Sequence, residues 1–244
     1  MNHSLNAAMK KFLIILLLSG FVGSNSYSQK NDPDFILKRI LDTFSKVHDY
    51  EVNIKIKVDV NFLKIPDTEA KIYFKQPDKV HFESETFALL PREGFDFSPS
   101  TLLKKKYTAF YEREDTIDNF RTAVVKVIPL GETDDVILST LWVDQSKNVV
   151  RKVESTTKTK GTFAIELKYD QTNLAYPLPS MMIFTFNIDK TNIPVGFSGD
   201  LDSDPNPKQK DNEPTTKGKV FVTYSNYKVN MGISDKIFEN KKRK

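Results

Sequence analysis

Histidine and cysteine, the side chains that most often carry acid–base, nucleophilic or metal chemistry, are scarce in this sequence. The chain of 244 residues has no cysteine and three histidines, His3, His48 and His81. A thiol nucleophile, a disulfide scaffold and a cysteine-ligated metal centre are therefore excluded. Because His48 and His81 share no spacing with other ligand-type residues, we expect neither a metal site nor a cofactor.

Two acidic clusters, Asp134-Asp135 and the run from Asp200 to Asp204, carry enough carboxylates to suggest calcium. An EF-hand loop needs a glycine at its sixth position and a terminal glutamate, and neither cluster has them. The sequence also lacks a glycine-rich phosphate loop, a G-x-S-x-G motif and a convincing Ser/His/Asp order. We interpret both clusters as solvated loops and expect the protein not to be an enzyme.

The charge of the chain is small and well mixed, with 36 Lys and Arg against 32 Asp and Glu and a formal net charge of +4. This excess is too weak to predict binding to nucleic acid. Basic clusters at Lys104–Lys106 and Lys241–Lys244 are typical of solvated ends, with contact to a partner or to anionic lipid as the alternative. At 39% hydrophobic residues the chain can bury a core.

Residues 1–28 have the three parts of a secretory signal peptide. Lys10 and Lys11 precede an apolar stretch from Phe12 to Val22, and small residues Ser26 and Ser28 precede the expected cleavage site. The stretch is well short of the roughly 20 residues that span a membrane. We expect export, hence a periplasmic location, and a single domain over 29–244.

The elements that follow begin with a helix predicted over about 33–48. Asp32 is a favoured N-cap residue, and Pro33 and Asp34 suit the first helical turn. Apolar residues then recur at helical spacing, which predicts one buried stripe. Its members are Ile36, Leu37, Ile40, Leu41, Phe44 and Val47.

The clearest pattern in the chain runs from Tyr50 to Phe62, where every even position is apolar and every odd position is polar or charged. This period of two predicts a strand buried on one face. Further strands are predicted in the ranges 70–75, 79–85, 105–112, 120–128, 136–143, 149–157, 163–169, 182–188 and 220–229. Nine or ten strands without crossover helices must pair antiparallel.

Two segments do not fit the strand pattern: 89–103, which contains two prolines and exposed-looking apolar residues, and the polar stretch 189–217. The second is predicted to be a long loop insertion.

One helix cannot cover the apolar face of so many strands. We therefore expect the sheet to curl into an incomplete, unclosed antiparallel β-barrel of about 9–11 strands, covered by the N-terminal helix and by 89–103 as a lid. Such a barrel leaves an apolar cavity, a natural site for a hydrophobic ligand. The alternative is a sandwich of two sheets that fill each other.

The order of four passages resembles the LolA-like family of periplasmic carriers that sort lipoproteins to the outer membrane. These passages are 71–80 (KIYFKQPDKV), 141–154 with its LWVD and VVRKVE segments, 161–169 (GTFAIELKY) and 222–233 (VTYSNYKVNMGI). The resemblance spans essentially the whole chain after residue 28. It implies an unclosed β-barrel with a helical lid over an apolar cavity.

The resemblance also implies a function. We expect a monomeric carrier that shelters lipoprotein acyl chains, or another lipid, between an inner-membrane lipoprotein-releasing transporter and an outer-membrane acceptor. The alternative is a non-catalytic envelope sensor or adaptor that binds a protein partner.

Site residues are assigned on the same basis. The inward apolar positions expected to line the lipid-binding cavity are Val52, Ile54, Ile56, Val58, Val60, Ile72, Phe74, Phe82, Phe184 and Phe186. The lid residues are Leu89, Leu90 and Phe95, with Arg92 in the same segment. In the family an arginine before the proline of the strand turn holds the lid, whereas this chain has Gln76, an amide that cannot form a charge-assisted fork. Arg92 is a candidate substitute.

Overall fold

The alternating segments of the sequence form one continuous sheet. The structure, a computed structural model, describes residues 31–60, 65–83, 103, 106–131, 135–159, 161–169, 176–189 and 215–239. Helix α2 (Pro33–Phe44) comes first and a short 3₁₀ helix η6 (Asp235–Ile237) comes last. Between them lie β1 (Asp49–Asp59), β2 (Thr68–Lys75), β3 (Lys79–Glu83), β4 (Tyr107–Ile117), β5 (Phe120–Pro129), β6 (Val136–Asp144), β7 (Val149–Thr157), β8 (Thr162–Lys168), β9 (Met181–Asp189) and β10 (Thr215–Val229).

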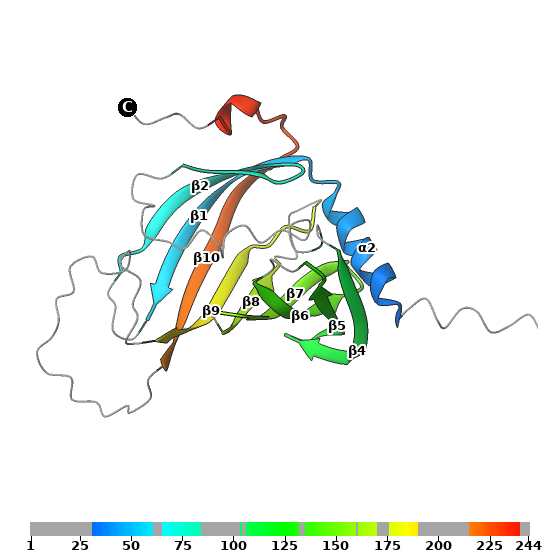
Figure 1. Cartoon of the computed structure of the whole chain (residues 1–244). Coiled ribbons are helices and arrows are strands. Elements are labelled where there is room, and N and C mark those ends of the chain that lie inside the picture. Colours follow the sequence, from blue (N-terminus) through cyan, green and yellow to red (C-terminus); the bar gives the residue numbers. More distant parts are fainter. Residues whose placement is uncertain are drawn as a thin grey trace, which may run out of the picture.

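The sheet is antiparallel throughout and does not close. Its strand order is β3-β2-β1-β10-β9-β8-β7-β6-β5-β4, so β3 and β4 are the two edges among the described residues. The pairing of β1 with β10 joins the first and last strands of the chain. Figure 1 shows the sheet bending strongly, with β1, β2 and β10 on one side of a hollow and β4 to β7 on the other. The expected unclosed antiparallel barrel is confirmed.

The face of the sheet that turns into the hollow, called the inner face here, carries the core. In β1 the even positions from Val52 to Val58 are buried, and the intervening Asn53, Lys55 and Lys57 are exposed. The period-two pattern therefore gave the correct face for this strand. Each fully buried aliphatic side chain of this kind stabilises the fold by about 1.5–3 kcal/mol.

Helix α2 begins where the sequence predicts and ends earlier. The Asp32 carboxylate accepts hydrogen bonds from the backbone N–H groups of Asp34 (3.0 Å) and Phe35 (3.4 Å). The helix ends at Phe44 rather than at about residue 48. Past this end, side chains from other parts of the chain donate to the free carbonyl groups, so no further helical turn is needed to satisfy them. The predicted helix reached residue 48, whereas His48 lies in the connection between α2 and β1, with its side chain exposed.

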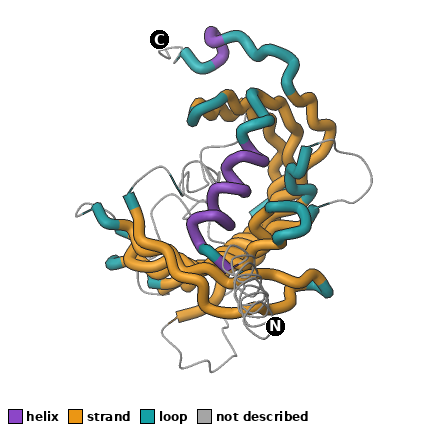
Figure 2. The backbone as a smooth tube through the Cα atoms, turned by 90° about the vertical axis from the view of Figure 1, so that its right-hand side faces the viewer, coloured by secondary structure: helices purple, strands orange, loops and turns teal. Residues whose placement is uncertain are grey.

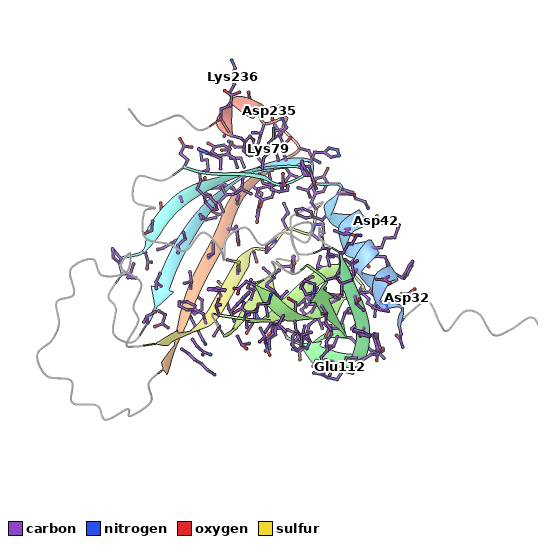
Figure 3. All side chains as sticks on the ribbon, viewed as in Figure 1. Asp32, Asp42, Lys79, Glu112, Asp235 and Lys236 are labelled. Atoms are coloured by element: carbon purple, nitrogen blue, oxygen red, sulfur yellow. The ribbon has the colours of Figure 1, made fainter. Side chains whose placement is uncertain are left out.

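The helix covers only part of the inner face. Ile36, Leu37 and Ile40 are its buried residues, and most of its contacts with the sheet are to β4 and β7, while Phe44 at its end packs 5.5 Å from the Phe74 ring of β2. Figure 2 shows the helix lying across the hollow with strands on both sides of it. In Figure 3 its polar residues Asp32 and Asp42 lie on the side turned away from the sheet. The amphipathic stripe therefore packs mainly on the β4–β7 half of the curved sheet and reaches β2 only at its C-terminal end.

The last residues of the described chain are tied to the β2–β3 turn. Asp235 of η6 pairs with Lys75 at 3.1 Å and with Lys79 at 2.8 Å. Figure 3 shows Lys79 and Asp235 together at the top of the molecule, far from Glu112 on β4. These exposed pairs position the end of the chain and contribute little to stability.

Several sequence-based assignments fall on residues outside those described. The signal peptide 1–28 and the lid residues Leu89, Leu90, Arg92 and Phe95 are among them. Leu103, at the end of the expected lid segment, is buried in the core. The polar insertion is shorter than the predicted 189–217, because Asp189 of β9 pairs with Thr215 of β10. Backbone pairing extends the two strands there whatever the polarity of their side chains.

Candidate functional site: an apolar cavity under the helix

A cavity of about 70 Å³ lies between the C-terminal half of α2 and the inner face of the sheet. The helix, β1, β2, β7, β8, β9 and β10 contribute to its wall, together with the β6–β7 turn and residues 177–179. The lining residues are Ile40, Thr43, Phe44, Val47, Tyr50, Ile72, Asn148, Val149, Val150, Leu167, Tyr169, Pro177, Leu178, Pro179, Met182, Tyr224 and Tyr227. The wall is therefore apolar and aromatic with a few neutral polar groups.

The ten wall residues named from the sequence all lie on the inner face but not around this cavity. Seven of them are buried, and Phe82, Phe184 and Phe186 are partly buried against the core. Only Ile72 of the ten lines the cavity. The other nine form the floor of the hollow elsewhere along the sheet, and their part in ligand binding remains a proposal.

Tyrosines make up the side of the cavity that sequence reasoning missed. Tyr50 stacks on Phe74 at a centroid distance of 5.0 Å and meets the edge of Tyr227 at 5.6 Å. Tyr224 stacks on Tyr227 at 6.1 Å. These rings give the wall a rigid aromatic surface with hydroxyl groups at its edge.

A β-bulge brings Tyr224 and Tyr227 to the same face. Asn53 of β1 pairs with Ser225, and Glu51 pairs with Lys228, so β10 has one residue more than β1 between these pairs. Asn226 takes up the difference with a φ of 56°. Strict alternation would have placed Tyr227 on the outer face, because it lies three positions after Tyr224, an odd number. Alternation of polar and apolar residues gives no sign of the bulge, so the inward position of Tyr227 could not be predicted from the sequence.

The tyrosine hydroxyl groups differ in their hydrogen bonds. Tyr169 donates to the Val150 carbonyl at 2.8 Å and Tyr227 donates to the Pro179 carbonyl at 2.9 Å. Within the described part of the chain, the Tyr224 hydroxyl has only the thioether sulfur of Met182, at 3.9 Å. Burial raises the pKa of all three hydroxyl groups, so they remain protonated donors at physiological pH.

The wall of the cavity is uncharged, since none of its described lining residues carries a formal charge. Among the residues that the structure describes, no group of three or more His, Cys, Asp or Glu side chains could hold a metal ion. Asp135, from one acidic cluster of the sequence, accepts a hydrogen bond from Thr159 at 3.0 Å. No helix in the described part of the chain has the length and hydrophobicity needed to cross a membrane.

A buried ion pair supports the β6–β7 turn at the edge of the cavity. Arg151 and Asp144 lie 2.7 Å apart, with their side chains 3% and 2% exposed. The Asp144 carboxylate also accepts hydrogen bonds from the Ser146 N–H and hydroxyl groups and from the Lys147 N–H group. The Arg151 guanidinium packs 3.4 Å from the centroid of the Phe120 ring. Both Asp144 oxygens are therefore hydrogen-bonded, and Arg151 donates to one of them through Nε and one terminal nitrogen, the pairing that a buried charge requires.

The pair predicts a loss of stability in acid. Burial acts to raise the Asp144 pKa, but hydrogen bonds from Ser146 and Arg151 outweigh it and hold the pKa below its ordinary value of 3.8. The resulting stabilisation is present above pH 3.8 and is lost as the pH falls through the lower pKa of the folded state. Urea unfolding at a series of acidic pH values should show this slope. Asp144→Asn should flatten it, and an unchanged slope would refute the assignment.

Comparison with known proteins supports the fold. No family model matches the sequence, and no curated protein sequence matches it. A solved DUF1329 family protein from Desulfovibrio piger superposes with a TM-score of 0.55 at 12% identity, covering 85% of this chain and 98% of the other. A LolA superfamily protein from Nitrosomonas europaea gives a TM-score of 0.53 at 13% identity, covering 85% and 97%. This chain has the LolA-like fold.

At such low identity the LolA-like fold says nothing of the ligand, and function has to be argued from the site. The fold does locate the position of Gln76, where the family resemblance implied an arginine. The Gln76 side-chain amide donates to the carbonyls of Val47 (3.2 Å) and Phe44 (3.5 Å) at the end of α2. The backbone N–H of Gln76 also donates to the His48 carbonyl at 2.8 Å. A neutral amide thus fastens the end of α2 in this LolA-like fold, although it cannot form the charge-assisted bidentate hydrogen bonds of an arginine.

A second fastening in the LolA-like barrel comes from the far end of the chain. The Asn230 side chain accepts from the His48 N–H group at 2.7 Å and donates to the Lys46 carbonyl at 2.9 Å. The buried Asp49 carboxylate accepts from the N–H groups of Met231 and Gly232. The connection between α2 and β1 is therefore held by β2 on one side and by the residues after β10 on the other.

Gln76→Leu should loosen the end of α2. The substitution removes the donor to the Phe44 and Val47 carbonyls, so we expect a loss of about 1–3 kcal/mol in the free energy of local opening. Hydrogen exchange should quicken at the α2 amides while the amides of β6 and β7 keep their protection. Gln76→Arg, which restores a donor, is the matched control. Equal exchange rates in Gln76→Leu and the wild type would contradict the fastening role.

Proposed function

We propose that this protein is a periplasmic carrier that binds the acyl chains of lipoproteins, or of another lipid, on the inner face of its sheet and moves them toward the outer membrane. The observation that supports this most is the mismatch between the apolar inner face and its cover. Helix α2 packs mainly on β4 and β7, with the Phe44 ring also 5.5 Å from the Phe74 ring of β2, and an apolar cavity remains at its C-terminal half. The LolA-like fold is consistent with this function.

Transfer energies give the binding mechanism. Each methylene group removed from water contributes about 0.8 kcal/mol, so even partial enclosure of an acyl chain gives useful affinity. The cavity of about 70 Å³ is less than half of the ~150 Å³ that accommodates benzene in an apolar protein interior. A whole chain therefore needs α2 to move outward, so that the chain extends from the cavity over the inner face.

The proposed roles of the individual residues follow from this path. The cavity under α2 holds one end of the acyl group, and the inner-face residues from Val52 to Val60 and Phe184 and Phe186 line the rest. The fastening of α2 by Gln76 and Asn230 sets how readily the helix opens. An inner-membrane lipoprotein-releasing transporter and an outer-membrane acceptor are the proposed donor and recipient.

The direct test is to purify the exported full-length protein and look for bound lipid. Native mass spectrometry should show the protein carrying an additional mass, and organic extraction should release lipid or lipopeptide. Purification without detergent is essential, because a detergent would displace the ligand. Protein that is folded, free of bound lipid and unable to take up a fluorescent acyl probe would refute the carrier proposal.

The second candidate is a non-catalytic envelope adaptor that binds a protein partner. The observation that favours it is an apolar patch on the outer face of β4 and β5, where Phe110, Ile128 and Leu130 are 52%, 38% and 60% exposed. Exposed apolar patches of this kind mark protein contacts in many soluble proteins. Phe110→Ser should leave probe uptake unchanged under either proposal, so retained uptake with a lost protein partner would favour the adaptor.

A further inference from the structure

The wall of the cavity combines tyrosine hydroxyl groups with a lack of formal charge. Among the described lining residues there is no Lys, Arg, His, Asp or Glu, whereas Tyr50, Tyr169, Tyr224 and Tyr227 all contribute. The chemistry of this wall limits which part of a lipid can occupy it. Given the carrier function proposed above, on which the inference rests, this chemistry determines the class of chemical group that enters the cavity.

Tyr224 is the tyrosine with hydrogen-bonding capacity to spare. The hydroxyl groups of Tyr169 and Tyr227 donate to backbone carbonyls at 2.8 and 2.9 Å. The Tyr224 hydroxyl has the Met182 sulfur at 3.9 Å, and thioether sulfur is a weak acceptor. Hydroxyl groups inside proteins normally have an oxygen or nitrogen partner, and the partly buried Tyr224 has none among the described residues. A ligand that brings a carbonyl oxygen to the Tyr224 hydroxyl would supply that partner.

Tyr224 lies at the point where the cavity meets the rest of the inner face. Tyr224 pairs with Ile54 of β1 on one side of β10. Two positions earlier in β10, Val222 pairs with Met182 of β9 on the other side. Phe184 and Phe186 follow along β9 and stack on each other at 5.1 Å. A carbonyl held by Tyr224 would therefore have a continuous apolar surface beside it for the attached hydrocarbon.

The lack of charge discriminates between forms of the same lipid. A carboxylate placed in this wall would lose its hydration without gaining a cationic partner, which strongly disfavours binding. The nearest buried guanidinium, that of Arg151, is already engaged by Asp144 through its Nε and terminal nitrogen atoms. A plain hydrocarbon end would fit but would leave the Tyr224 hydroxyl without an oxygen acceptor.

From this geometry we infer that the cavity receives the uncharged carbonyl end of an ester- or amide-linked acyl group, with the Tyr224 hydroxyl donating to the carbonyl oxygen. The protein consequently selects acylated lipids over free fatty acids. The cavity of about 70 Å³ has room for the carbonyl group and its first methylene groups, and the remaining chain lies on the inner face.

The experiment compares three ligands that share one hydrocarbon chain: methyl laurate, lauric acid and dodecane. Each displaces a fluorescent acyl probe from the full-length exported protein, at mildly alkaline pH where the acid is ionised. Methyl laurate should displace the probe at a concentration about tenfold or more below that of lauric acid. Lowering the pH should narrow this gap, because protonation removes the charge from the acid.

Tyr224→Phe isolates the hydroxyl group. Its affinity for methyl laurate should fall about three- to tenfold, the effect of one hydrogen bond, while its affinity for dodecane stays unchanged. Tyr73→Phe is the matched control, because Tyr73 lies on the outer face of β2, where its hydroxyl donates to Glu83 at 2.7 Å. Both affinities of that variant should equal those of the wild type.

The outcomes separate this inference from the carrier proposal. If lauric acid binds the wild type as well as methyl laurate does, or if Tyr224→Phe loses affinity equally for methyl laurate and dodecane, the inference is wrong and the carrier proposal stands. If none of the three ligands displaces the probe, both fail. If Tyr224→Phe does not fold, the comparison of methyl laurate with lauric acid on the wild-type protein still tests the inference.

Discussion

Arg151→Met is expected to lower the free energy of unfolding by about 3–5 kcal/mol. The substitution leaves the Asp144 carboxylate buried at 2% exposure without its cation, and it removes the guanidinium from the face of the Phe120 ring. Burial of an uncompensated charge is among the most destabilising single changes known in folded proteins. Urea or guanidinium denaturation followed by circular dichroism at neutral pH measures the effect.

Two controls make this expectation specific. The double variant Asp144→Asn/Arg151→Met removes both charges and keeps an acceptor for Ser146 and Lys147, so it should regain much of the lost stability. Lys38→Met breaks the exposed pair of Lys38 with Asp42 on α2 and should change stability by less than about 0.5 kcal/mol. A loss in Arg151→Met no larger than that in Lys38→Met would contradict the role of the buried pair.

Thr43→Phe is expected to reduce lipid uptake by an order of magnitude or more. Thr43 lies on α2 and lines the cavity of about 70 Å³, and a benzyl side chain there would occupy much of the space that an acyl end needs. The change adds neither charge nor an unpaired polar group to the wall, so the fold should tolerate it better than a charged substitution. Titration with a fluorescent acyl probe measures the affinity.

The matched control at the same position is Thr43→Ala, which removes the polar group and enlarges the cavity. It should bind the probe at least as well as the wild type does. Thermal unfolding of both variants shows whether the fold is intact. Equal probe affinity in Thr43→Phe and Thr43→Ala would mean that the ligand binds elsewhere, and the proposed site would have to be abandoned.

Much of the sheet could be predicted because its signal is local. Side chains alternate between the two faces of any strand, so the polar and apolar positions of β1 identified its buried face before any partner strand was known. The start of α2 was equally readable, since Asp32 and Pro33 act within a single turn. The end of α2 was not, because it depends on Gln76 and Asn230, which come from β2–β3 and from the residues after β10.

The site was only partly predictable for the same reason. Sequence reasoning gave the inner face and the need for a ligand or lid to cover it, yet of ten proposed wall residues only Ile72 lines the cavity. Phe44, Val47 and Tyr50 were recognised as inward positions but not as cavity residues. Where the helix crosses the sheet decides which inward residues face free space, and that crossing follows from packing rather than from periodicity.

The amino-acid sequence by itself determined the architecture: an antiparallel sheet too apolar for one helix to cover, with few groups suited to catalysis. Tertiary structure alone decided where the free space lies and what borders it. The bulge at Asn226 places Tyr227 beside Tyr224, and the ion pair of Asp144 with Arg151 fixes the turn next to them. The physical reason is the sequence separation over which each effect acts. Side-chain alternation and helix capping involve residues close in the chain, whereas a cavity forms between residues that folding brings together from distant strands.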